Sequence, residues 1–108
     1  MHISETQRQV HLTSRAKGWY DGGARNIPEM LCLIHSEVSE ALEDFRIGKL
    51  STVVREDGKP EGFPSELADI VIRVMDLAEY LGIDLEGEIF KKARHNESRP
   101  YRHGGKVA

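Results

Sequence analysis

The segment at residues 65–81, SELADIVIRVMDLAEYL, constrains the fold most strongly, because as a helix it is apolar around most of its circumference. Such a helix is expected to lie at the centre of the protein and to be largely buried. Its polar residues nevertheless recur in one narrow stripe, formed by Glu66, Asp69, Arg73 and Asp76. Because burying this stripe without partners would be costly, we expect it to reach solvent or to line a polar cavity.

Helices are also expected near both ends of the chain. The first begins at Ser4, which has capping-box spacing with Gln7, and runs towards Lys17. The last begins after Asp84, a typical cap, and runs to about residue 97. Pro100 prevents its easy continuation.

A further helix begins after Asn26, a favourable cap followed by Pro28 in the first turn, and it stops at Gly48. Residues 48–64 are rich in Gly and Pro and contain the turn signal Asp57-Gly58. This segment is therefore expected to form a long loop or a short hairpin. Four helices and one such connection predict an all-α protein, a four-helix bundle.

The length and composition of the chain fit one domain over residues 1–108. No apolar run approaches the ~20 residues that span a bilayer, and MHISETQRQV has no apolar signal-peptide core. We therefore expect a cytoplasmic protein with no membrane segment. Cys32 is the only cysteine, and its apolar helical surroundings predict a buried free thiol.

The net charge of −3 is unevenly distributed. Residues 91–108 carry +5, which includes a basic tail at residues 98–108, and the rest of the chain carries −8. An acidic body with a basic end fits an anionic ligand that is held partly by a metal ion and partly by cationic side chains. A solvated tail without such a role would have the same composition.

Two pairs of carboxylates have the spacing of metal ligands on helices. Glu37 and Glu40 lie one turn apart on one helix face, as do Glu66 and Asp69, and we call these four residues the carboxylate quartet. Packed face to face, the pairs would surround a cation with the oxygen ligands that Mg²⁺ prefers. A di-iron bundle would instead carry Glu-x-x-His on two helices, so Mg²⁺ or Mn²⁺ is the expected ion. Taken alone, either pair would fit an ordinary solvated helix surface.

The quartet also carries a family resemblance. Its spacing resembles the signature of the MazG-like, all-α nucleoside triphosphate pyrophosphohydrolases. Three stretches are similar to family segments and cover nearly the whole chain: KGWYDGGARNIPEMLCLIHSEVSEALEDFR, DGKPEGFPSELADIVIRVMDLAEYLGID and NESRPYRHGGK. The resemblance implies a single MazG-like helical-bundle domain, assembled as a homodimer or homotetramer. It also implies Mg²⁺-dependent hydrolysis of a (d)NTP to the monophosphate and pyrophosphate.

The resemblance further implies roles for individual residues. The quartet matches the metal ligands of the family, and Glu37 or Glu40 could take the proton from the attacking water. Lys92 and Asn96 match a Lys-x-x-x-Asn pattern near the nucleotide. Some relatives have another Glu where this chain has Ser36, which leaves the number of metal ions open.

Three more residues are candidates for substrate contact. Arg99 follows Asn96 and could meet the phosphates. Arg73 could do the same, or it could form an ion pair with Asp69 one turn away. Trp19 could stack on a nucleobase, or it could fill the space between the first two helices.

The leading interpretation is therefore a Mg²⁺-dependent nucleotide pyrophosphohydrolase that serves nucleotide-pool housekeeping. The alternative is a non-catalytic helical module whose basic tail binds nucleic acid or an acidic partner, although the acidic body makes nucleic acid an unlikely ligand. A homo-oligomer is expected on physical grounds as well, because the first and last helices are too short and too mixed in composition to cover the apolar segment 65–81 on every side.

Overall fold

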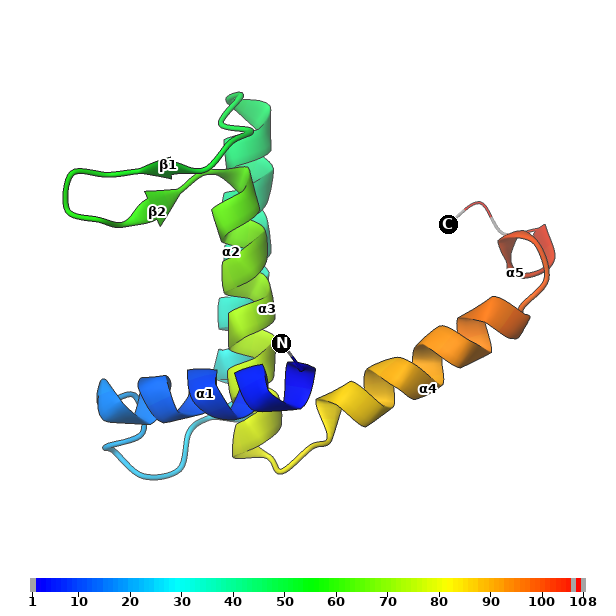
Figure 1. The fold of residues 1–108 in the computed structure, drawn as a ribbon, viewed down its shortest axis with the longest axis horizontal. Helices are drawn as coiled ribbons and strands as arrows, with labels where there is room; N and C mark the ends of the chain where they lie inside the picture. Colours follow the sequence, from blue (N-terminus) through cyan, green and yellow to red (C-terminus); the bar gives the residue numbers. More distant parts are fainter. Residues whose placement is uncertain (1, 106, 108) are drawn as a thin grey trace.

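A computed structural model describes residues 2–105 and 107 (Figure 1). Four helices dominate this part of the chain, which confirms the all-α class, and a single helical turn follows them near the C-terminus. The helices are α1 (Ile3–Ala16), α2 (Ile27–Arg46), α3 (Phe63–Tyr80), α4 (Leu85–Ser98) and the short α5 (Arg102–Gly105). None of the helices in the described residues is long and apolar enough to cross a membrane.

The core of the fold is the antiparallel pair of α2 and α3, which pack along their lengths. α1 crosses this pair at a steep angle near the C-terminal end of α3 and packs against it (Figure 1). Four apolar side chains of α2 and α3 are buried in the interior, namely Met30 and Ala41 of α2 and Met75 and Ala78 of α3. The crossing leaves a concave region between α1 and the α2–α3 pair, and the candidate site lies there.

Two of the predicted helix starts are confirmed by their caps. The side chain of Asn26 accepts a hydrogen bond from the backbone N–H of Glu29 at 3.0 Å, and that of Asp84 accepts one from Gly87 at 3.1 Å. The stop at Gly48 is also confirmed, because α2 ends at Arg46 and Gly48 has a φ of 81°.

The predicted capping box at Ser4 is wrong. α1 begins at Ile3, its N-cap is His2, and no side chain caps it. Gln7 is buried and donates instead to the carboxylate of Glu79 and the carbonyl of Ile83, both at 2.9 Å. Its amide therefore joins α1 to the end of α3, because a tertiary contact competes better for this side chain than the local cap does.

The connection between α2 and α3 contains the short hairpin that was one of the two expected forms. Strands β1 (Val53–Val54) and β2 (Pro60–Glu61) pair antiparallel, with Gly58 at the turn in the left-handed region. α3 then starts at Phe63, two residues earlier than the sequence predicts.

Burial within one chain differs from the expectation for the apolar helix. Only Met75 and Ala78 of α3 are buried, and Val71 is 50% exposed. α4 projects away from the other helices (Figure 1). Its first turn is joined to α1 by a hydrogen bond from the Ser4 N–H to Glu86 at 3.3 Å. None of the residues of α4 is buried. One chain therefore does not close into a four-helix bundle, and the bundle type stays a prediction.

Cys32 is exposed, so the prediction of a buried thiol is wrong. It lies on the side of α2 that faces away from α3 and α1, because those elements cover only one face of the helix. Of the apolar residues around it in the sequence, Leu31 is exposed, Leu33 and Ile34 are half-buried and Met30 is buried.

Candidate metal centre

The antiparallel pairing of α2 and α3 brings three members of the carboxylate quartet together. Glu37 and Glu40 of α2 and Glu66 of α3 each offer one carboxylate oxygen, and these oxygens lie within 4.8 Å of one another. We call these three residues the carboxylate cluster. Glu66 in the first turn of α3 thus lies opposite Glu37 and Glu40 in the middle of α2.

Two oxygens of the cluster are buried without a donor. Glu37 is only 8% exposed, and its Oε2 has no hydrogen-bond partner among the described residues. Oε2 of Glu66 is in the same situation. Because an unpaired buried carboxylate oxygen is costly, these atoms fit a bound cation, which would supply the missing partner.

The cluster also holds its protons unusually tightly. Burial raises the pKa of Glu66 to about 7, and the nearby carboxylates of Glu37, Glu40 and Asp69, which favour its protonated form, contribute to this rise. The pKa of Glu40 is raised as well, mainly because the adjacent carboxylate of Glu37 favours the protonated form of Glu40. Protons and a cation would therefore compete for the same oxygens.

Asp69, the fourth member of the quartet, lies beside the cluster and does not belong to its tight group. Its side chain is exposed one turn after Glu66 on α3. Burial and the charge of Glu37 raise the pKa of Asp69, so the two carboxylates are close enough to repel each other.

A cavity of about 430 Å³ adjoins the cluster in the concave region between α1, α2 and α3. Glu37, Asp69 and Arg73 line one part of it, and Lys17, Trp19 and Arg25 line another. Three residues of the polar stripe of α3, namely Asp69, Arg73 and Asp76, therefore line a cavity, whereas Glu66 does not. The cavity is not the purely polar one that was expected as an alternative to solvent, because Val10, Leu33 and Ile72 also line it. Glu37 belongs to both the cluster and the cavity, so a ligand in the cavity would reach the candidate metal ligands.

Trp19 is 66% exposed and lines this cavity, so the prediction that it fills the space between the first two helices is wrong. The neighbouring aromatic residue, Tyr20, packs instead between α1 and α3, against His11 and Tyr80, with ring centroids 4.9 and 5.0 Å apart, respectively. Trp19 is thus left free to contact a ligand.

Arg73 does not form the ion pair with Asp69 that the i,i+4 spacing suggested. Its Nε donates instead to Oε1 of Glu37 at 2.9 Å. The packing of α2 against α3 offers this neighbour, which no spacing along α3 could reveal.

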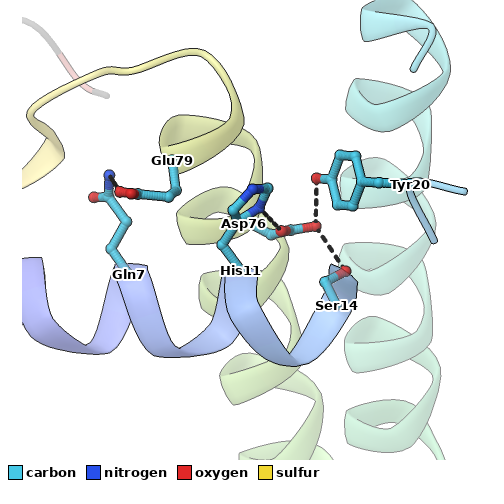
Figure 2. A network of polar contacts seen from close by, with 6 residues as sticks. All are labelled: Gln7, His11, Ser14, Tyr20, Asp76 and Glu79. Carbon is cyan, nitrogen blue, oxygen red and sulfur yellow. Dashed lines mark hydrogen bonds and ion pairs between the residues drawn. The ribbon is translucent and has the colours of Figure 1, made fainter. Parts of the chain in front are cut away.

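Asp76, the last residue of the stripe, accepts three hydrogen bonds (Figure 2). The donors are Nδ1 of His11 at 2.7 Å, the hydroxyl of Ser14 at 3.1 Å and the hydroxyl of Tyr20 at 2.9 Å. Burial and the hydrogen bond to Asp76 strongly raise the pKa of Tyr20, which therefore stays a donor. This network fixes α1 and the start of the following loop against α3.

Sequence reasoning missed this network. A signal was present, because Gln7, His11 and Ser14 are polar residues at i, i+4 and i+7 of the first helix, and such spacing places them on one face. Figure 2 shows that this face points towards Asp76 and Glu79.

The predicted phosphate contacts on α4 are not brought to the site within one chain. Lys92 and Asn96 are exposed, Arg99 is half-buried, and none of the three lines the cavity. They lie on the helix that projects away from the α2–α3 pair (Figure 1).

Protein-family models, curated proteins and solved structures give no match to this chain.

Proposed function

We propose that the protein is a Mg²⁺-dependent nucleoside triphosphate pyrophosphohydrolase, which converts a (d)NTP to the monophosphate and pyrophosphate in nucleotide-pool housekeeping. The observation that carries this proposal is the carboxylate cluster with two buried oxygens lacking donors, set next to a cavity lined by cationic side chains. The MazG-like resemblance points to the same reaction.

The donor set of the cluster favours a hard cation. Glu37, Glu40 and Glu66 would hold it through carboxylate oxygens, with Asp69 beside them. Mg²⁺ prefers such ligands and Mn²⁺ can replace it, whereas His or Cys would be expected for softer ions. When bound, the ion neutralises phosphate charge and lowers the pKa of a coordinated water.

The side chains of the cavity would bind and orient the substrate. Arg73, Arg25 and Lys17 offer positive charge to the triphosphate, and exposed Trp19 offers a ring on which a nucleobase can stack. These contacts would place the α-phosphorus near the cluster, where positioning and neutralisation of charge supply most of the rate enhancement.

Glu37 or Glu40 would accept the proton of the attacking water. The new bond forms between the water oxygen and the α-phosphorus, and the bond from that phosphorus to the α–β bridging oxygen breaks, so pyrophosphate leaves. Glu37, whose Oε1 already accepts a bond from Arg73, has less freedom to take the proton.

Assembly into a homodimer or homotetramer would complete the site. Lys92, Asn96 and Arg99 lie on the projecting part of the chain and would reach the phosphates held by a neighbouring copy. The basic charge of residues 91–102 complements the acidic cluster.

The test is turnover of a (d)NTP panel with Mg²⁺ and detection of pyrophosphate. Glu40→Gln and Asp69→Asn should each lower kcat/KM by more than about 100-fold, because a lost contact to the metal–phosphate assembly is worth several kcal/mol. Glu43→Gln is the matched control, since Glu43 is exposed one turn beyond Glu40 and should retain activity. Far-UV circular dichroism should show unchanged helicity, and full activity in both site variants would refute the proposal.

A second function has one observation in its favour, namely the projecting and exposed α4 with its basic residues. This arm would suit a non-catalytic module that binds nucleic acid or an acidic partner. Such a module would show salt-sensitive binding that Arg99→Ala and Arg102→Ala weaken, together with no turnover of any nucleotide.

A further inference from the structure

We propose that Arg73 is a positioning residue for the candidate metal centre, where it holds the carboxylate of Glu37 in place by one oxygen and leaves the other for the cation. This inference rests on the proposed function only in assigning a divalent cation to the carboxylate cluster. It concerns the binding of the ion, and it does not depend on which nucleotide is hydrolysed.

The contact between the two residues is specific to one atom on each side. Nε of Arg73 donates to Oε1 of Glu37 at 2.9 Å, and Oε2 of the same carboxylate is buried with no donor among the described residues. Arg73 therefore provides a hydrogen-bond donor for one oxygen of Glu37. The second oxygen of this member of the carboxylate cluster stays available as a ligand atom.

Glu37 needs such an anchor because its neighbours repel it. Glu40 and Glu66 offer oxygens within 4.8 Å of its own, so the charged forms of the three carboxylates repel one another unless a proton or a cation lies between them. A Glu side chain has three rotatable bonds, and fixing it in advance lowers the entropy lost when the cation binds. Outer partners of metal ligands act in this way, and their loss typically lowers metal affinity 10–100-fold.

The positive charge of Arg73 acts in the opposite direction, because it repels a cation. The side chain of Arg73 is 41% exposed, so water screens this repulsion, whereas the side chain of Glu37 is 11% exposed and its hydrogen bond is shielded. We therefore expect that Arg73 strengthens cation binding by positioning Glu37 more than it weakens cation binding by its charge.

Three substitutions separate these two effects by their covalent geometry. In Arg73→Gln, the amide nitrogen is bonded to Cδ as Nε is in arginine, so the donor remains at the same place in the side chain while the charge is lost. Arg73→Met has neither donor nor charge. Arg73→Lys keeps the charge but moves the donor one atom further out.

The experiment is a titration of the nucleotide-free protein with Mn²⁺, with free Mn²⁺ followed by electron paramagnetic resonance. Arg73→Met should weaken Mn²⁺ binding by about 10–100-fold, whereas Arg73→Gln should stay within about threefold of the wild type, and Arg73→Lys should fall between them. The control is Arg8→Met, which removes an exposed arginine from α1 and should leave the affinity unchanged. All variants are measured at a temperature at which circular dichroism in EDTA shows them folded.

Each outcome decides a different point. If the wild type binds Mn²⁺ and Arg73→Met binds it equally well or more tightly, positioning by Arg73 is refuted while the metal centre stands. Equal weakening in Arg73→Gln and Arg73→Met would also refute positioning, because Arg73→Gln keeps the donor that is proposed to hold Glu37. If the wild type binds no Mn²⁺, the proposed function itself fails together with this inference.

Discussion

Glu66 is partly buried beside carboxylates of like charge, and its pKa rises from the ordinary value of 4.5 to about 7. The folded, metal-free protein thus binds a proton at Glu66 more tightly than the unfolded chain does. The resulting stabilisation is fully present below about pH 4.5 and is lost as the pH rises through about 7. We expect the urea midpoint in EDTA to fall between pH 5 and pH 8.

The variant Glu66→Gln isolates this contribution. Its side chain does not titrate, so the decline of the urea midpoint with pH should be shallower than in the wild type. Adding Mg²⁺ at pH 8 should raise the wild-type midpoint by mass action and should raise that of the variant less. An identical pH slope in both proteins would contradict the assignment of the raised pKa to Glu66.

At the residue scale, the sequence predicted which carboxylates share a face but not what they touch. Of the four carboxylates that the i,i+3 spacings paired, Glu37, Glu40 and Glu66 lie together in the structure and Asp69 lies outside their tight group. The partner of Arg73 could not be predicted in this way, because the spacing suggested only Asp69 and the packing of α2 on α3 is what brings Glu37 to Arg73. Spacing along the sequence determines which face of its own helix a side chain lies on. Which residue that side chain contacts depends on how the neighbouring helix packs.

At the scale of elements, the loop between α1 and α2 is fastened to α3 at two points. The hydroxyl of Tyr20 donates to Asp76, and the backbone N–H of Arg25 donates to the hydroxyl of Tyr80 at 2.9 Å. These contacts hold the segment that carries Trp19 at the cavity. The loop is therefore expected to be part of the cooperative fold.

Tyr20→Phe should lower the free energy of unfolding by about 1–2 kcal/mol, because it removes one hydrogen bond to Asp76 and keeps the ring packing. Asp76→Ala should cost at least about 3 kcal/mol, since it leaves several donors, including buried His11, without a partner. Urea denaturation measures both values. Tyr101→Phe is the control, because that side chain is 84% exposed, and an equal loss there would show that the Asp76 network is not the cause.

Element boundaries were predictable where the signal was local. Asn26 and Asp84 cap their helices through contacts that lie within four residues, so their sequence patterns were sufficient. Gln7 matched a local pattern equally well, but its amide is used by Glu79 and Ile83, more than seventy positions away. The start of α1 was therefore misplaced by a tertiary contact that the sequence pattern does not contain.

At the scale of the whole molecule, the helical class followed from the sequence but the closure of the bundle did not. The apolar circumference of residues 65–81 indicated a central helix, and within one chain its cover is supplied only by α1 and α2. α4 has an apolar side at Ile89 and Phe90, yet it lies away from α3. Periodicity shows that a face is apolar, and it leaves open whether the same chain or another copy covers it.

The uncovered apolar surface leads to the last prediction, that the chain self-associates as a homodimer or homotetramer. Leu42 and Phe45 of α2, Val71 of α3 and Phe90 of α4 are each at least 50% exposed, and burying such side chains releases about 25 cal/mol per Å². Sedimentation velocity at micromolar concentration should therefore show a dimer or tetramer. Phe90→Asp should shift the chain towards monomer, because a charge in an apolar interface is costly, whereas Tyr101→Asp in the exposed tail should not. A wild-type monomer under these conditions would contradict self-association, and it would also leave Lys92 and Asn96 without a route to the carboxylate cluster.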